Sequence, residues 1–315
     1  MDAETAQALL SEGAVLVVQD LPVGTEFGLD YNSWHVGPRF RGVKMVPPGP
    51  HFIFTSATQL GRSSVDDDGR LVRRPETAPR TGTFRVLERR QVAVYRWDAA
   101  LEDLVPGDES PEALERYRAN LRDMDPFLGA YPFDHTLKRW LSLTNFVTGD
   151  VVARLVPRTG RIASVTVHQP APAPPDSAAA AADDAAAPAA AAAAAAPPAG
   201  QAMELDPTFA NLRWARDSAS AIQFVTLPER PYPPGAPPDL VTRYSMDKSY
   251  VLQQVLDQTG GQEQLLGELQ FAFVTFLIGQ VFDGFEHWKL LVALLCNCDE
   301  ALTTHPKLFL DFIGK

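Results

Sequence analysis

Residues 262–298, QEQLLGELQFAFVTFLIGQVFDGFEHWKLLVALLCNC, decide how the second half of the chain folds. Apolar residues recur there at helical spacing on two stripes, one with Leu266, Leu269, Phe273 and Phe276, the other with Phe271, Val274, Ile278 and Phe282. Two apolar stripes on one helix indicate burial on both sides. Gly279 is expected to divide the segment into two antiparallel helices. The second of them should direct inward Val281, Phe285, Trp288, Leu291 and Leu295.

Three aromatic side chains of this stretch, Phe273, Phe276 and Trp288, are expected to form the structural core of the helical part. Truncating a buried aromatic residue to alanine typically costs about 3 to 5 kcal/mol. The most apolar run, 269–282, is 14 residues long and contains two Gln. Crossing a bilayer takes about 20 apolar residues. The run therefore predicts a buried core helix, and we expect no membrane contact.

Helical patterns continue on both sides of this stretch. SMDKSYVLQQVLDQ is expected to form a helix with Ser245 as N-cap, ended by the glycine pair 260–261. Another helical segment follows Asp299 and is interrupted by Pro306. An all-α C-terminal domain is therefore predicted over residues 241–315.

The first half of the chain has the pattern of β-strands. Five short segments rich in β-branched and aromatic residues are separated by turn formers: AVLVV from Ala14, VKMV from Val43, HFIFT from His51, TFRVL from Thr83 and QVAVYRW from Gln91. Helices are expected over 2–11, 110–124 and 135–147, the second capped by Ser110. The predicted fold class is α+β, with an N-terminal, mainly antiparallel β-rich domain over residues 1–168 and the helical domain after it.

A low-complexity block separates the two halves. Residues 170–199 contain 19 Ala and 7 Pro. Ala buries little area and scattered Pro prevents one long helix, so residues 169–203 are predicted to be a disordered linker. Residues 204–240 should then hold one strand, AIQFVTLPE at 221–229, and a stiff connector, PYPPGAPPDL at 231–240.

The charge is unevenly distributed along the chain. The net charge is −11, and up to residue 168 there are 20 Lys and Arg against 22 Asp and Glu, whereas beyond it there are 8 against 17. Proteins that bind nucleic acid need basic surface to neutralise phosphates. The acidic second half therefore argues against direct contact with nucleic acid or an anionic membrane and favours protein partners.

No motif for catalysis, a cofactor or a metal emerges from the sequence. GPRFRGVK at 37–44 lacks the Lys-Ser/Thr pair of a phosphate-binding loop, and DGFEH at 283–287 lacks the second His of a metalloprotease helix. The acidic run at 66–69 lacks the alternating ligands of a calcium loop and predicts a solvated turn. Cys296 and Cys298 are too close for a helical disulfide, so we expect them to pack in a reducing compartment. Catalytic, cofactor and metal sites are all predicted to be absent.

One cluster has the composition of a protein interface. Tyr31, Trp34, Arg39, Phe40 and Arg41 lie within eleven residues of a turn-rich segment. Trp, Tyr and Arg are the residue types that most often dominate binding energy at interfaces. The alternative is that Trp34 and Phe40 are core residues and the arginines are merely solvated.

Several segments resemble one known family. LPVGTEFGLDYNSWHVGPRFRGVKMVPPGPHFIF (21–54), ANLRDMDPFLGAYPF (119–133), LKRWLSLTNF (137–146), SMDKSYVLQQVL (245–256) and LGELQFAFVTFLIGQVFDGFEHWKLLVALLC (266–296) resemble the AAR2 family of pre-mRNA splicing factors. The match runs through both halves in order, and YNSW and GELQFAFV are its most specific parts. Family members continue past the segment matching FLDFIGK with more helices and a tail, so the helical domain is expected to be truncated here.

The resemblance implies a β-rich N-terminal domain, a helical C-terminal domain and a non-enzymatic role in assembling the U5 snRNP, in the cytoplasm and the nucleus. It implies binding to the large spliceosomal scaffold Prp8, through the scaffold's RNase-H-like and Jab/MPN-like domains, until phosphorylation releases the factor. Docking of the Brr2 helicase would be delayed meanwhile. Two alternatives remain open: a helical adaptor outside splicing, and a hydrolase whose site is assembled from distant residues.

Overall fold

The computed structural model describes residues 9, 11–59, 63–65, 71–73, 76–164, 168–170, 214–216, 219–228 and 230–314. Three expectations fall wholly or mostly outside these residues: the helix over 2–11, the turn at 66–69 and the Ala/Pro block at 170–199. Residues up to 165 and from 219 onward form one compact unit, and the residues between them form a second. In that second unit, β15 (His168–Pro170) and β16 (Trp214–Arg216) form an antiparallel pair. The domain limits at 168, 203 and 240 stay predictions.

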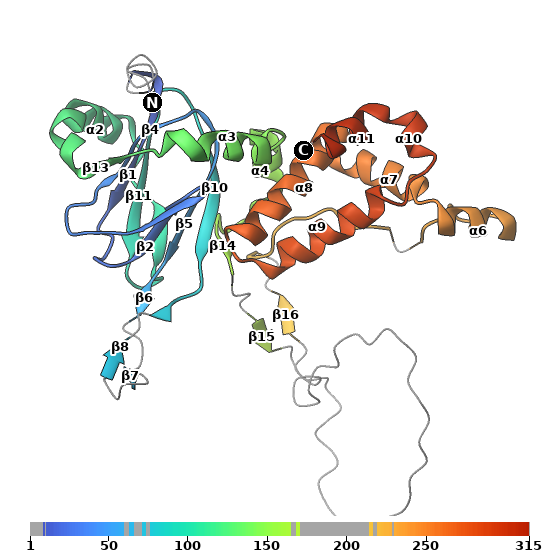
Figure 1. Cartoon of the computed structure of the whole chain (residues 1–315), viewed down its shortest axis with the longest axis horizontal. Helices are drawn as coiled ribbons and strands as arrows, with labels where there is room; N and C mark the ends of the chain where they lie inside the picture. The colour runs from blue at the N-terminus through green and yellow to red at the C-terminus, as the bar shows by residue number, and fades with distance from the viewer. Residues whose placement is uncertain are drawn as a thin grey trace, which may run out of the picture. The chain divides into compact units, whose positions relative to one another are not determined.

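In the described part of the first half, the chain forms two five-stranded sheets (Figure 1). The first has the order β12-β11-β1-β4-β13, with β1 (Ala14–Gln19), β4 (Gly42–Val46), β11 (Val92–Asp98), β12 (Asp103–Pro106) and β13 (Leu128–Ala130). The second has the order β14-β10-β5-β2-β3, with β2 (Glu26–Leu29), β3 (Asn32–His35), β5 (Gly49–Ser56), β10 (Thr81–Leu87) and β14 (Ile162–Ala163). Short antiparallel ladders pair β6 (Thr58–Gln59) with β9 (Glu76–Thr77) and β7 (Ser63–Val65) with β8 (Leu71–Arg73).

Antiparallel pairing prevails, as predicted. Every pair of the second sheet is antiparallel, whereas the first sheet pairs β1 with β11 and β4 with β13 in parallel. All five strand segments quoted above for the first half are strands, namely β1, β4, β5, β10 and β11. With the helices of the second half, the α+β class is confirmed.

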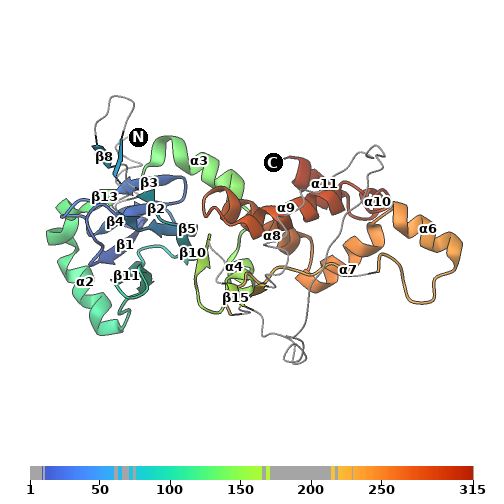
Figure 2. The same cartoon turned by 90° about the horizontal axis from the view of Figure 1, so that it is seen from below.

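The helices of the first half cover the sheets. They are α2 (Pro111–Met124), α3 (Phe133–Thr144) and α4 (Gly149–Leu155), with a 3-10 turn, η1 (Asp125–Phe127), after α2. Ser110 caps α2 as predicted, because its Oγ accepts a hydrogen bond from the Ala113 N–H. Side chains of α2 pack on buried valines of β1 and β11, and Figure 2 shows the helix beside these strands. The helix predicted over 135–147 starts and ends earlier, as α3.

The second half of the chain is helical from residue 238 onward. Its helices are α6 (Pro238–Met246), α7 (Ser249–Thr259), α8 (Gln262–Leu277), α9 (Phe282–Leu295), α10 (Ala301–Thr304) and α11 (Pro306–Ile313). Gly260, in the left-handed conformation, ends α7 as predicted, and the chain turns between α8 and α9 around Gly279. None of the helices in the described part of the chain is long and apolar enough to cross a membrane.

The predicted N-cap Ser245 is wrong. Pro238 starts a separate helix, α6, and Ser245 lies in its last turn, where its Oγ donates to the Val241 carbonyl. Lys248 is the N-cap of α7 and makes no side-chain cap bond, whereas Asp247 before it accepts at Oδ1 from the Ser249 N–H at 2.8 Å.

The strand predicted at 221–229 is also wrong. Residues 222–228 belong to no strand, helix or turn. Their backbone bonds elsewhere: the Gln223 N–H donates to the Leu155 carbonyl at the end of α4, and the Val225 N–H donates to the Glu268 carboxylate on α8. A side-chain acceptor thus takes the place of a neighbouring strand.

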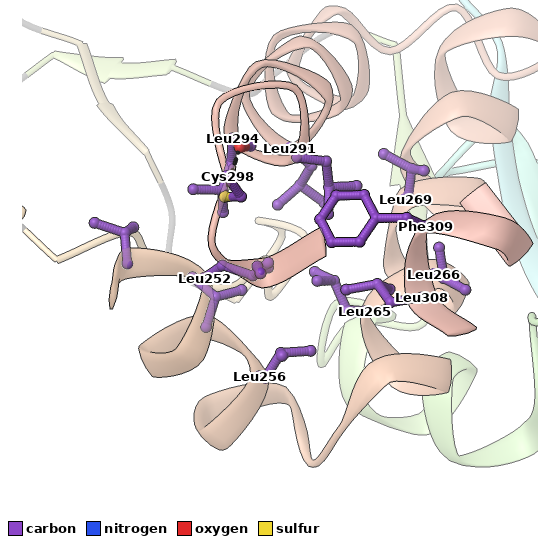
Figure 3. Close-up of a cluster of buried hydrophobic side chains, with 14 residues drawn as sticks. Leu252, Leu256, Leu265, Leu266, Leu269, Leu291, Leu294, Cys298, Leu308 and Phe309 are labelled. Atoms are coloured by element: carbon purple, nitrogen blue, oxygen red, sulfur yellow. Dashed lines mark hydrogen bonds between the residues drawn. The ribbon is translucent and has the colours of Figure 1, made fainter. Parts of the chain in front are cut away.

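The helical half has its own core. Buried side chains of α7, α8, α9 and α11 meet there, among them Leu252, Leu265, Leu291 and Leu308 (Figure 3). Cys298 belongs to this cluster, which confirms its predicted packing, whereas Cys296 is exposed; both thiols are free.

Aromatic side chains join the helices to the second sheet. The ring of Phe271 on α8 stacks on Phe84 of β10 with centroids 4.5 Å apart. Both lie in a core cluster that also contains Phe52, Trp140 and Leu155. The helical half is therefore attached to the sheet by a continuous hydrophobic core, which explains why both belong to one compact unit.

Candidate partner-binding surfaces

The β2–β3 hairpin presents the most specific motif of the sequence, YNSW. Its two-residue turn is Asp30–Tyr31, with Asp30 in the left-handed conformation at a φ of 56°. Gly28 is required on β2 because the ring of Phe54 lies across it: a Cβ there would lie 2.0 Å from the Phe54 Cζ. The ring covers the glycine and replaces the side chain that the strand lacks.

A buried polar network holds this turn in place. The Asp30 carboxylate accepts three hydrogen bonds: from His51 Nδ1 at 2.7 Å, from the Tyr131 hydroxyl at 2.6 Å and from the Phe52 N–H at 3.0 Å. The other ring nitrogen of His51, Nε2, lies 2.7 Å from the Pro47 carbonyl. Both neighbours of the imidazole are acceptors, an arrangement that favours the imidazolium form, in which both nitrogens donate. Burial opposes this charge, but the Asp30 carboxylate and the Pro47 carbonyl outweigh it and raise the pKa of His51.

The hairpin leaves two aromatic side chains at the surface. Tyr31 on the turn and Trp34 on β3 are 38% and 37% exposed. The Tyr31 ring packs edge-on against Trp140 of α3, 6.1 Å between centroids, which limits its motion. Amphipathic rings that are held in one orientation lose little entropy on binding.

The other members of the predicted cluster separate into two groups. Phe40 is half-buried and packs on Phe27, 5.1 Å between centroids, at the edge of the first core. Arg39 and Arg41 are exposed, and Arg41 Nη1 donates to the Phe40 carbonyl at 2.8 Å. Phe40 thus fits the core alternative, whereas Tyr31, Trp34, Arg39 and Arg41 share the surface. Their binding role stays a prediction.

A second aromatic surface lies on α8 and α9. We call it the aromatic row; its members are Phe273, Phe276, Phe282, Phe285 and Trp288. Neighbouring rings are in contact, with 5.3 Å between the centroids of Phe273 and Trp288 and 4.5 Å between those of Phe276 and Phe285. The helices approach closely because Gly284 faces α8, where a Cβ would lie 2.5 Å from Thr275 Oγ1.

The row differs from the core predicted for these helices. Phe273, Phe276 and Trp288 are half-buried, and of the three only Trp288 packs against the helical core. Phe282, predicted to lie on a buried stripe, is 63% exposed, because the chain turns just before it. The sequence identified both stripes but could not indicate which of them faces the sheet. The stabilising role of the three aromatic residues stays a prediction.

The buried histidines do not form a hydrolytic site. His51 and Asp30 are both buried, and the second nitrogen of His51 bonds a backbone carbonyl instead of a nucleophile. His287 donates from Nε2 to Glu268 and stacks on Phe224 with centroids 4.1 Å apart. Across the described residues, no group of three or more His, Cys, Asp or Glu side chains could hold a metal ion.

Comparison with known proteins connects both halves to one family. A model of the AAR2 N-terminal domain matches residues 12–157, and a model of the AAR2 C-terminal repeat region matches residues 224–315. The chain belongs to the AAR2 family. The Ala/Pro block lies between the two matched regions.

Full-length relatives agree with this assignment. The proteins named "Protein AAR2 homolog" of Homo sapiens and Mus musculus are 39% identical over 318 residues, covering all of this chain and 77% of theirs. The homologue of Caenorhabditis elegans is 29% identical over 323 residues, covering 98% of this chain and 79% of its own. Family identity makes this chain a splicing-related AAR2 factor.

Proposed function

We propose that this AAR2 protein is a non-enzymatic assembly factor of the U5 snRNP that binds the scaffold Prp8 and delays docking of the Brr2 helicase. Membership of the AAR2 family is the observation that carries the proposal. The proposed contacts are the scaffold's RNase-H-like and Jab/MPN-like domains, and the proposed location is the cytoplasm and the nucleus. The exposed Tyr31 and Trp34 on a rigid hairpin, and the aromatic row, supply surface of the kind that protein interfaces use.

The first expected result is binding of the purified chain to the scaffold's two C-terminal domains at physiological salt, without binding to bare snRNA. The acidic second half, with 8 Lys and Arg against 17 Asp and Glu, offers few groups for counterion release from RNA. Calorimetry with the scaffold fragment and a gel shift with naked snRNA measure the two affinities. Brr2 added to the complex should bind the fragment more weakly than it binds the fragment alone. Salt-sensitive, sub-micromolar RNA binding, or no affinity for the fragment, would contradict the proposal.

The second expected result concerns the exposed arginines of the loop. Arg39→Ala should weaken scaffold binding by about tenfold if the side chain is an interface anchor. The same substitution should change the free energy of unfolding by no more than about 0.5 kcal/mol, because the side chain is exposed. Arg41→Ala should weaken binding similarly. Arg118→Ala on α2, an exposed arginine paired with Glu115, is the matched control and should leave the affinity unchanged. An unaltered affinity in both loop variants would favour the solvated alternative.

A further inference from the structure

β3 is an edge strand of the second sheet, and its outer edge is open. It pairs only with β2 in the sheet order, and its last three residues, Ser33, Trp34 and His35, are all exposed. A strand at the border of a sheet normally alternates between buried and exposed side chains. Exposure of three consecutive residues indicates that no described segment covers Ser33 to His35, whereas Asn32 at the start of the strand bonds Thr136 of α3.

The ladder fixes which backbone groups point outward. The Val36 N–H donates to the Thr25 carbonyl, and the Val36 carbonyl accepts from the Gly24 N–H, so residue 36 bonds inward. Antiparallel residues alternate between bonded and non-bonded pairs. Trp34, opposite Phe27, therefore also bonds inward, whereas the backbone groups of Ser33 and His35 face away from β2. No described residue donates to them or accepts from them.

Nothing in this edge prevents pairing with another chain. Natural sheets protect their edges with Lys, Pro, bulges or inward-pointing charges. β12, at the border of the first sheet, has such protection: Asp103 is buried in an ion pair with Arg161, and Pro106 ends the strand. The sequence of β3, Asn-Ser-Trp-His, has neither Lys nor Pro, and its register with β2 is regular.

The described charged residues beside this edge are mainly exposed cations, although the exposed Asp20 lines the same hollow as Arg41. Glu26 on β2 is buried against Arg80, and Asp30 is buried against His51. Exposed cations remain on both sides: Arg39 and Arg41 on the loop after β3, and Lys138 and Arg139 on α3. Arg139 lies close enough to act on the Tyr31 hydroxyl electrostatically. In the described residues these four cations have no ion-pair partner.

From these observations we infer that the outer edge of β3 receives an extended, acidic segment of a protein partner, which pairs with the backbone of Ser33 and His35 as an added strand. Only an extended backbone supplies the alternating donors and acceptors that match such an edge. Acidic side chains of the added strand would face the surrounding arginines and lysine, and Trp34 would offer apolar contact area. The inference rests on the proposed function, since it takes the scaffold as the source of this segment.

Proline substitution at Ser33 tests the inference. Proline lacks the N–H that the added strand would use, and its ring would obstruct that strand. The fold should tolerate it, because edge strands accept proline where the N–H faces solvent. Ser33→Pro should weaken binding to the scaffold fragment by at least about tenfold. Ser33→Ala, which keeps the N–H, should bind within about twofold of the unmodified chain.

Amide hydrogen exchange in the unmodified complex provides a measurement that does not depend on the variant's folding. The amides of Ser33 and His35 should exchange much more slowly on binding, while the amide of Trp34, already bonded to β2, serves as reference. Equal affinities of the two Ser33 variants, or unchanged exchange at Ser33 and His35, would overturn the inference and leave the proposed function standing. An affinity that does not fall with rising salt would overturn the acidic character of the segment. Failure of the unmodified chain to bind the fragment would overturn both proposals.

Discussion

Replacing Asp30 by asparagine should lower the free energy of unfolding by about 3 to 5 kcal/mol, the usual cost of removing one partner from a buried ion pair. The carboxylate is fully buried and accepts from His51, Tyr131 and the Phe52 N–H. In Asp30→Asn the amide would carry donors toward groups that themselves donate, and the His51 charge would lose its counterion. Urea unfolding followed by circular dichroism measures the loss.

The pH dependence of this loss identifies its cause. The pKa of His51 is raised in the folded state, so its contribution is fully present below the unfolded pKa of about 6.5. That contribution disappears as the pH rises through the folded-state pKa. The difference in the free energy of unfolding between Asp30→Asn and the unmodified protein should therefore narrow at alkaline pH. Asp125→Asn is the matched control, because Asp125 pairs with Lys44 at the surface and should cost about 1 kcal/mol or less. Equal losses of unfolding free energy in Asp30→Asn and Asp125→Asn would contradict a stabilising role of the buried network around Asp30.

Elements with strong local signals could be predicted from the sequence. β1, β4, β5, β10 and β11 are short β-branched runs between turn formers, and α2 begins at a Ser-Pro pair, so neither depends on distant residues. The β2–β3 hairpin lacked such a signal, since Gly28, Asn32 and Ser33 have low strand propensity. It is held by Phe54, which covers Gly28, and by the Asp30 network, both of which are tertiary features.

The candidate surfaces could be predicted only in part for the same reason. Composition identified Tyr31, Trp34 and Phe40 together, but only the fold separates Phe40, which packs on Phe27, from the two exposed rings. Helical spacing identified two apolar stripes on α8, whereas contact with Phe84 determines that Phe271 faces the sheet. Which stripe is buried depends on which distant element of the chain packs against the helix. A periodic pattern does not contain that information.

Replacing Glu268 by alanine should also destabilise the protein by about 3 to 5 kcal/mol, because it removes the acceptor that joins four segments. Glu268 lies fully buried on α8. Its Oε1 accepts from the Val225 N–H at 2.7 Å and from His287 Nε2 at 2.8 Å, and its Oε2 accepts from Arg154 Nη1 at 2.5 Å. The substitution would leave the Val225 N–H and His287 Nε2 without this acceptor in the interior, whereas the partly exposed Arg154 keeps its bond to the Gln264 carbonyl.

The stability lost in Glu268→Ala should depend on pH in the opposite direction to the stability lost in Asp30→Asn. Burial alone would raise the pKa of Glu268, but the bonds from His287, Val225 and Arg154 outweigh it and lower the pKa. The stabilisation is therefore present above the unfolded pKa of about 4.3 and is lost as the pH falls through the folded-state value. Unmodified protein and Glu268→Ala should converge in stability at acidic pH.

A local measurement distinguishes loss of the hydrogen bonds to Glu268 from a general loss of stability. The Val225 N–H is one of the few backbone groups that attach residues 222–228 to the helices, and Phe224 beside it stacks on His287. In Glu268→Ala this segment should be cleaved by protease well before the rest of the chain unfolds. Glu263→Ala on the same helix, which removes only an exposed partner of Lys307, should leave both the cleavage rate and the unfolding midpoint almost unchanged. Equal cleavage rates and unfolding midpoints in Glu268→Ala and Glu263→Ala would show that residues 222–228 are held by their apolar contacts alone. The buried carboxylate would then not join the two halves of the chain.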